Sequence, residues 1–331
     1  MRLENFLALT QASLINEPCV HSFENIVFEA HKVKRGDLFF AYTQEDIGAA
    51  VANGAYGVVF DKPTQISDNE IAWIKANSLD EALKKLIRFK SIKKEIVAYE
   101  CNEIIFKLSL QVITLSNFFP IFGDLKSIFK TILEMQDGTI ILFCPALVNK
   151  DIFAVVKKMP HPPYFPIEIM EQTLFETSFI YDNVFYERQL ISPFFIPYLE
   201  ELLHLYKTLN IEYKLRKFTP IDHFEPVFIN KKFEIKNFGT SDKVLIFEPN
   251  SELVDEQILF LEYHASWANT IFILPKHIKV ESRENFFNYK NEKEIVAILR
   301  ENRFNFALVV GVDKSILSKP LSSQRQLTMD F

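Results

Sequence analysis

Residues 31–41 read His-Lys-Val-Lys-Arg-Gly-Asp-Leu-Phe-Phe-Ala, and residues 53–59 read Asn-Gly-Ala-Tyr-Gly-Val-Val. In each stretch, glycine comes just before an apolar run that has the length of a strand. Gly36 permits a tight turn before a buried strand, while Gly54 and Gly57 allow a helix to end and pack closely against a sheet. The two stretches therefore predict consecutive buried strands that are joined by a helix.

The first hundred residues continue this alternation of strands and helices. Ser78 has Glu81 at the spacing of a capping box, which predicts the start of a helix. Alternation of this kind implies a mainly parallel sheet with helical crossovers. Strands are predicted over residues 25–28, 37–42, 56–61 and 71–74, and helices over residues 47–53 and from 78 onward.

The rest of the chain also has an α/β pattern. Four prolines between 157 and 166 predict an irregular segment, and residues 318–331 have the composition of a tail. Further strands are predicted over residues 112–115, 139–143, 243–247, 270–274 and 306–310, and further helices over 128–135, 197–209, 254–263 and 292–301.

Composition and charge exclude several classes of protein. The net charge is −6, which disfavours broad nucleic-acid binding, because proteins that coat phosphate backbones are usually basic. The three cysteines form no CxxC pair, which favours reduced thiols in the cytoplasm and no zinc site. Apolar runs fall short of the ~20 residues that a membrane-spanning helix needs. We therefore expect a cytoplasmic α/β protein of several domains without a membrane span.

The stretches around 36–41 and 53–59 together resemble the first domain of the Mur ligases. The resemblance implies a UDP-sugar-binding domain, a central ATPase domain with a P-loop and a small Rossmann-like C-terminal domain. It also implies a reaction in which ATP activates a UDP-muramoyl precursor for joining to an amino acid or dipeptide. The pattern is most similar to members that add the third residue or the D-Ala-D-Ala dipeptide. The corresponding blocks are 1–102, a reduced central block 103–215, 216–317 and the tail 318–331.

The resemblance places the UDP-binding site at the turn before the first of these strands. Glu29-Ala30-His31 stands where the family has Asp-Ser-Arg, so the usual serine and arginine are missing. Loss of a bidentate guanidinium contact predicts weak or absent binding of the pyrophosphate. The candidate UDP-binding residues are Glu29, His31, Arg35, Gly36 and Asp37.

The family's P-loop is expected after the strand at 112–115. Residues 114–127 read Thr-Leu-Ser-Asn-Phe-Phe-Pro-Ile-Phe-Gly-Asp-Leu-Lys-Ser, in which Lys126-Ser127 mimics the terminal pair of the motif and Gly123 belongs to the degenerate loop. Leu125 stands at the essential glycine position and Pro120 at the first one. A phosphate cradle needs glycines with positive φ, and leucine there costs roughly 1 kcal/mol. The loop is thus predicted to be degenerate, with ATP and magnesium required only if the chain is an active ligase.

The histidines suggest no metal site. Seven are scattered, and none pairs with a carboxylate at helical spacing. Asp222-His223 is predicted to be a surface pair, and His264 and Trp267 are expected to pack at the end of a helix. Glu248, followed by Pro249-Asn250-Ser251, resembles a reduced form of an acidic motif in the family's C-terminal domain.

The C-terminal six residues read Gln-Leu-Thr-Met-Asp-Phe and resemble peptides that dock on the bacterial sliding clamp. Gln326, Leu327, Met329 and Phe331 would be the contacts of such a peptide. The same alternation is equally typical of a last strand or a packed tail.

Three functions follow from these observations. The first is a non-catalytic Mur-ligase homologue that binds cell-wall synthesis proteins or a UDP-muramoyl peptide, in peptidoglycan precursor synthesis or cell-shape control. The second is an active, divergent ATP-dependent UDP-muramoyl-peptide ligase. The third is a DNA-metabolism protein that docks on the sliding clamp.

Overall fold

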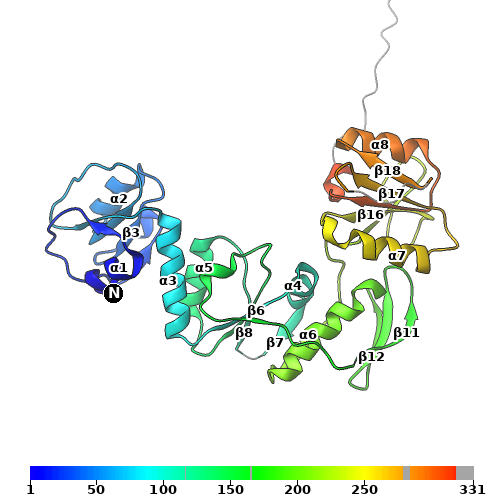
Figure 1. Ribbon diagram of the computed structural model, residues 1–331, viewed down its shortest axis with the longest axis horizontal. Helices are drawn as coiled ribbons and strands as arrows, with labels where there is room; N and C mark the ends of the chain where they lie inside the picture. Colours follow the sequence, from blue (N-terminus) through cyan, green and yellow to red (C-terminus); the bar gives the residue numbers. More distant parts are fainter. Residues whose placement is uncertain (116, 165, 279–283, 318–331) are drawn as a thin grey trace, which may run out of the picture. The chain divides into compact units, whose positions relative to one another are not determined.

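A computed structural model describes residues 1–115, 117–164, 166–278 and 284–317 of the chain, which form two compact units. Figure 1 shows their helices and strands in sequence colours. Residues 161–207 belong to the same unit as the C-terminal sheet. Unit 1 comprises Met1–Phe106, Thr114–Pro160 and Thr208–Tyr213, and unit 2 comprises Lys107–Ile113, His161–Lys207 and the residues from Lys214 onward.

Unit 1 begins with a five-stranded sheet. Its spatial order is β1–β5–β4–β3–β2, in which β1 is antiparallel to β5 and all other neighbours are parallel. The mainly parallel sheet predicted from the sequence is therefore confirmed. The strands are β1 (Ser13–Leu14), β2 (Ile26–Val27), β3 (Leu38–Phe40), β4 (Gly57–Phe60) and β5 (Ala72–Lys75).

Helices cover both faces of this sheet. Helix α2 packs on one face, over a core that includes Phe39 and Trp73. Helix α1, which the sequence pattern did not predict, and helix α3 pack on the other. The hydroxyl of Ser78 accepts the Glu81 amide N–H at 3.3 Å, as the capping-box spacing predicts. The helical segments are α1 (Leu3–Thr10), η1 (Ala30–Lys32), α2 (Asp46–Ala52) and α3 (Leu79–Lys93).

Two glycines are required by the geometry of the first sheet. Gly36 has φ +99°, a left-handed conformation in which other residues are strained. A Cβ atom on Gly57 would lie 2.8 Å from the Phe23 ring and 2.9 Å from Leu38 Cδ1. Gly57 is therefore needed for close packing, as expected from the sequence.

A second, four-stranded sheet completes unit 1. Its order is β10–β6–β9–β8, and all neighbours are parallel. The strands are β6 (Val97–Glu100), β8 (Phe118–Pro120), β9 (Ile140–Phe143) and β10 (Val156–Lys158). The helical segments are α5 (Leu125–Glu134) and η2 (Lys150–Ile152), together with the first residues of α4 (Glu103–Ser109), whose residues from Lys107 onward belong to unit 2.

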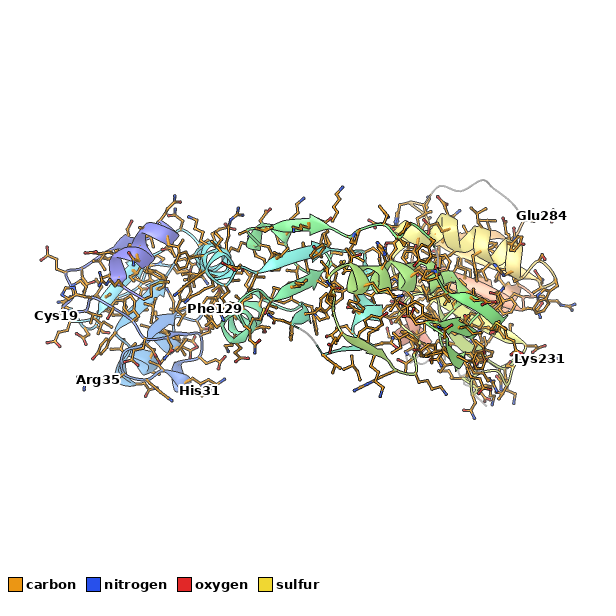
Figure 2. The ribbon with its side chains drawn as sticks, turned by 90° about the horizontal axis from the view of Figure 1, so that it is seen from below. Cys19, His31, Arg35, Phe129, Lys231 and Glu284 are labelled. Carbon is orange, nitrogen blue, oxygen red and sulfur yellow. The ribbon has the colours of Figure 1, made fainter. Side chains whose placement is uncertain are left out.

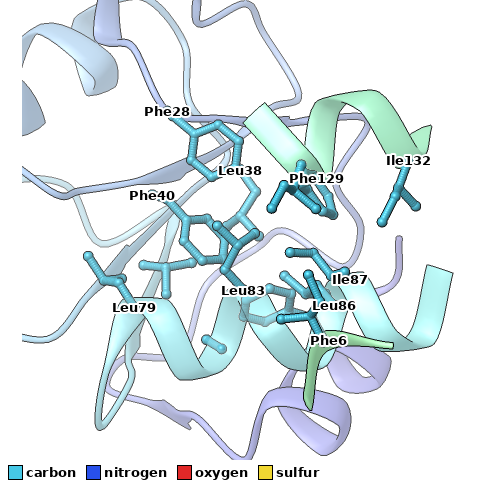
Figure 3. Close-up of a cluster of buried hydrophobic side chains, with 14 of the residues drawn as sticks. Phe6, Phe28, Leu38, Phe40, Leu79, Leu83, Leu86, Ile87, Phe129 and Ile132 are labelled. Atoms are coloured by element: carbon cyan, nitrogen blue, oxygen red, sulfur yellow. The ribbon is translucent and has the colours of Figure 1, made fainter. Parts of the chain in front are cut away.

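Helices α3 and α5 pack between the two sheets and give unit 1 a continuous core. Figure 3 shows Phe28 and Phe40 beside Leu83 and Leu86 of α3 and Phe129 of α5. The rings of Phe28 and Phe129 meet edge to face, with centroids 5.9 Å apart. Shared burial of this kind makes the two sheets one compact body.

Unit 2 contains an antiparallel three-stranded sheet, which the sequence pattern did not predict. Its order is β11–β12–β13, and α6 follows it along the chain. The elements are β11 (Glu168–Gln172), β12 (Thr177–Tyr181), β13 (Val184–Gln189), η3 (Pro193–Phe195) and α6 (Ile196–Thr208). Two further strands, β7 (Val112–Thr114) and β14 (Tyr213–Leu215), form a separate two-stranded sheet.

The second sheet of unit 2 has five strands in the order β15–β16–β19–β17–β18. Strand β15 is antiparallel to β16 and the remaining neighbours are parallel, so a Rossmann-like alternation is present here as predicted. The strands are β15 (Glu225–Ile229), β16 (Lys243–Glu248), β17 (Thr270–Pro275), β18 (Phe286–Tyr289) and β19 (Phe306–Val310). The helical segments are η4 (Ser251–Leu253), α7 (Val254–His264), α8 (Glu292–Glu301) and η5 (Lys314–Leu317).

An aromatic cluster holds the two sheets of unit 2 together. Phe175, in the turn after β11, has ring contacts with Phe224, Phe228, Phe238 and Phe306. These partners come from β15, β19 and the loops beside them, so the cluster fixes the three-stranded sheet against the C-terminal one.

Within the described ranges, no helix combines the length and the apolar character that crossing a membrane requires. The three cysteines are free thiols; Cys19 is exposed, whereas Cys101 and Cys144 are buried. Burial raises the pKa of the Cys101 thiol, which therefore stays protonated.

Candidate functional site

The turn before β3 uses its aspartate internally. Asp37 is only 2% exposed; its Oδ1 accepts the Asn25 side-chain amide at 2.9 Å and its Oδ2 accepts the Lys34 backbone N–H at 2.9 Å. Both oxygens therefore shape the turn from within. Asp37 and the buried Gly36 therefore fix the backbone conformation of this turn.

The other candidate UDP-binding residues lie around this turn. Glu29 forms ion pairs with Lys32 and with Lys130 of α5, the latter at 2.7 Å. Hydrogen bonds from Lys130 and then Lys32 lower the pKa of Glu29 to about 2. His31 and Arg35 are exposed, and Figure 2 labels both at one end of unit 1. The Glu29 carboxylate is thus already neutralised by two of the protein's own lysines.

The segment that resembles a P-loop follows a different strand from the one predicted. The strand that precedes α5 in the parallel sheet is β8, whereas β7 pairs with β14 in another sheet. Helix α5 begins at Leu125 instead of 128, and only the four residues 121–124 connect it to β8. Leu125 is consequently the first helical residue, and the prediction that it occupies a positive-φ position is wrong. Gly123 has φ +107° instead.

The N-terminus of α5 is capped by a carboxylate of the chain itself. Asp124 Oδ1 accepts the Ser127 backbone N–H at 2.7 Å, and this bond is the main cause of the lowered pKa of Asp124. The Lys126 ammonium lies 3.9 Å from the centre of the Tyr42 ring, in a cation–π contact. The helix end that could receive an anion therefore holds a side-chain anion, and the nearby lysine contacts an aromatic face.

Tyr42 is fixed in turn by its own hydrogen bond. Its hydroxyl donates to Asp80 Oδ1 at 2.8 Å, and burial together with this bond raises the pKa of Tyr42. Tyr42 is a neutral phenol at physiological pH and holds its ring in place under Lys126. The sequence signal for the capped end of α5 is Asp124, because aspartate is a preferred residue at a helix N-cap.

Unit 2 contains a buried polar network that the sequence pattern placed on the surface. His223 is 1% exposed and Glu248 is fully buried; His223 Nδ1 lies 2.7 Å from Glu248 Oε1. Glu248 also accepts the backbone N–H groups of Phe224 and Asn250, at 3.2 and 2.9 Å, and the side-chain amide of Gln257. The prediction of a surface pair is wrong, because the partner of His223 is 25 residues away on β16.

Asp222 and Lys107 complete this network. Lys107 Nζ forms an ion pair with Asp222 at 2.7 Å and lies 3.2 Å from His223 Nε2. The geometry fits a neutral imidazole that accepts at Nε2 and donates from Nδ1 to Glu248. The adjoining cavity of about 20 Å³ has room for one water molecule, so the network is placed to stabilise the fold.

The remaining candidates concern metal ligands and the tail. Within the part of the chain that the structure describes, no three His, Cys, Asp or Glu side chains converge into a metal-binding group. Gln326, Leu327, Met329 and Phe331 lie outside the described residues.

Comparisons with known proteins reveal a shared fold without recognisable sequence similarity. No protein-family model matches the sequence, and no curated protein matches it. MurF from Acinetobacter baumannii has a TM-score of 0.51 and 8% identity, over 93% of this chain and 95% of that one. MurF ligase from Thermotoga maritima, solved in complex with ADP, has a TM-score of 0.50 and 10% identity, over 88% and 95%. The chain therefore has the multidomain α/β fold of the Mur ligases, as its sequence motifs predicted.

Proposed function

We propose that this chain is a non-catalytic protein with the Mur-ligase fold, which acts by binding partners in peptidoglycan precursor synthesis or in cell-shape control. The observation that carries the proposal is the capping of α5 by Asp124, whose carboxylate accepts the Ser127 N–H at 2.7 Å. A helix N-terminus in this position is where a P-loop holds phosphate. The cell-wall setting is carried over from the proteins that share the fold.

The residues around α5 do not fit the phosphates of ATP. A P-loop surrounds phosphate with successive backbone N–H groups of a glycine-rich segment, whereas residues 120–127 contain a single glycine, Gly123, and have Pro120 and Leu125 at the two glycine positions of the motif. The Asp124 carboxylate would repel a phosphate at the helix end and already occupies one donor. Lys126, which would reach the phosphates in such a loop, instead contacts the ring of Tyr42.

The environment of Glu29 supports weak or absent binding of a UDP-sugar. Its carboxylate is paired with Lys32 and Lys130, so these lysines are not available to a pyrophosphate without breaking the pairs. The family's arginine is replaced by His31, which is exposed. We therefore place the chain's activity in contacts with other macromolecules.

Isothermal titration with ATP and magnesium tests the proposal. We expect no saturable binding at submillimolar ATP, and the same result for Lys126→Ala. The control variant is Lys130→Ala, which removes a lysine of the same helix that lies outside the motif. A micromolar Kd that Lys126→Ala abolishes and Lys130→Ala preserves would overturn the proposal in favour of an active ligase.

Thermal shift with a UDP-muramoyl peptide tests the second part. We expect the melting temperature to stay unchanged at millimolar ligand. A concentration-dependent rise that is lost in Arg35→Ala would show that the turn around Gly36 still binds the family's substrate.

A further inference from the structure

Helix α7 (Val254–His264) in unit 2 and the turn that follows it carry exposed apolar side chains. Leu259, Tyr263 and Trp267 follow at intervals of four residues and are 65%, 79% and 76% exposed. His264 and Trp267 pack at the helix end as expected, against the rings of Phe260 and Phe306, but Trp267 leaves most of its surface exposed. The face that α7 buries contains Val254, Ile258 and Leu261. Large aromatic side chains gathered on a surface mark interaction sites.

Two hollows adjoin these side chains, and a third shares lining residues with both. One lies beneath Trp267 and has a volume of about 600 Å³, and another, of about 660 Å³, lies between β11 and α7. The third, of about 600 Å³, lies on the three-stranded sheet. Gln172 lines all three hollows, and we call the three together the β11–α7 groove.

Strand β11, whose Ile169, Glu171 and Gln172 line the groove, has an unpaired edge. Strand β11 pairs with β12 on one side, and within the described ranges no other strand pairs with its outer edge. All five of its residues are exposed, including Ile169 and Met170. An open edge presents backbone N–H and C=O groups that a second extended chain can pair with.

The charges around the groove select the kind of chain that fits. Its lining carries five carboxylates, from Glu171, Glu176, Glu201, Asp242 and Glu256, and one guanidinium, that of Arg188, which pairs with Glu176 at 3.6 Å, so the lining keeps an excess of negative charge. Strand β11 itself contains Glu168 and Glu171 and no lysine. Two copies of β11 would bring these carboxylates together, which disfavours self-pairing, whereas a basic segment complements them.

We propose that the β11–α7 groove binds an extended segment of a partner protein, which pairs with β11 and carries lysine or arginine between large apolar residues. Its backbone extends the three-stranded sheet, its apolar side chains pack on Leu259, Tyr263 and Trp267, and its cations face the five carboxylates. The proposal rests on the binding role inferred above and names the class of partner. It involves unit 2 alone.

Selection from a phage-displayed library of random eight-residue peptides on the full chain tests the groove. We expect the enriched peptides to alternate Lys or Arg with large apolar residues and to bind more weakly at higher salt. Enrichment of acidic peptides, or no enrichment, would overturn the proposal.

Variants of α7 locate the binding of an enriched peptide by fluorescence anisotropy. The double variant Leu259→Glu, Tyr263→Glu should weaken binding at least about tenfold. The matched control is Phe89→Glu, Ile92→Glu, which changes two exposed apolar residues of α3 in unit 1, and it should bind as the wild type does. Equal affinity in both variants would place the peptide elsewhere and contradict the proposal.

Hydrogen exchange distinguishes strand pairing from side-chain docking alone. Peptide binding should slow exchange of the β11 amides, and N-methylation of alternate peptide residues should abolish binding. Unchanged exchange in β11 would contradict the pairing.

A chain that ends at Leu317 tests a second occupant, the segment 318–331. Peptides that bind only this shortened chain would show that the groove belongs to the chain's own C-terminal segment, which would overturn the proposal of a partner. The ATP titration is independent of these results: ATP binding with intact peptide binding would refute the non-catalytic role alone, and loss of peptide binding without ATP binding would refute the groove alone.

Discussion

The N-terminus of α5 in unit 1 and the outer face of α7 in unit 2 differ in where their side chains find partners. At α5, Asp124 satisfies the helix end and Lys126 contacts Tyr42, so groups that could serve a ligand are engaged within the chain. At α7, Tyr263 and Trp267 expose more than three-quarters of their surface. The comparison sets a helix end that is closed off by partners within the chain against a surface whose side chains are open to solvent.

The buried network of unit 2 is a second place where polar groups find their partners within the chain. Breaking it should give the largest loss of stability. Glu248→Ala removes the acceptor of His223, Phe224 N–H and Gln257 at a fully buried position. Breaking a buried pair by removing one partner costs about 3–5 kcal/mol. Urea unfolding should show this loss, and Glu248→Gln, which keeps the volume and one acceptor, should lose less. A free energy of unfolding equal to that of the wild type would refute the structural role of the network.

Removing the cap of α5 should have a smaller effect. Asp124→Ala leaves the Ser127 N–H without its acceptor and should lower the free energy of unfolding by about 1 kcal/mol. Asp124→Asn retains a good capping side chain and should remain near the wild type in urea unfolding. If Asp124→Ala were as stable as Asp124→Asn, the carboxylate would not be the cap.

The ion pairs of Glu29 predict an acid dependence of stability. The pKa of Glu29 is lowered from 4.5 to about 2, so its contribution is present above pH 4.5 and is lost as the pH falls toward 2. Unfolding measured across this range should therefore depend less on pH in Glu29→Gln than in the wild type. Identical pH profiles would show that Lys32 and Lys130 do not hold this carboxylate in solution.

Substitutions on the exposed face of α7 should have the smallest effect on stability. Tyr263→Ser should change the free energy of unfolding by no more than about 0.5 kcal/mol, because the side chain is 79% exposed. Leu261→Ala on the buried face of the same helix is the control and should cost about 2–5 kcal/mol. A large loss for Tyr263→Ser would mean that this side chain is packed.

Much of the fold could be predicted because its signals are local. Gly36 lies two residues before β3, Gly57 is the first residue of β4, and Ser78 lies three residues from the amide that it caps. The buried strands β16, β17 and β19 are continuous apolar runs, which is typical of a sheet covered on both faces. The family resemblance then supplied the overall arrangement.

The candidate sites were harder to predict because their contacts are distant in sequence. Nothing near His223 indicates Glu248, and nothing near Lys126 indicates Tyr42. Strand β8 was not predicted because it is three residues long and ends in Pro120, and proline is disfavoured in strands. All five residues of β11 are exposed, so that strand lacks the apolar alternation by which strands are recognised.

A ligase assay tests the central claim most directly. The full chain is incubated with ATP, magnesium, a UDP-muramoyl tripeptide and D-alanyl-D-alanine, and phosphate release is measured beside MurF from Acinetobacter baumannii as positive control. Because Asp124 caps α5 and Lys126 contacts Tyr42, we expect no phosphate release above background, either in the wild type or in Lys126→Ala. Phosphate release that requires all the substrates and disappears in Lys126→Ala would contradict the account, because it would require α5 to hold a nucleotide.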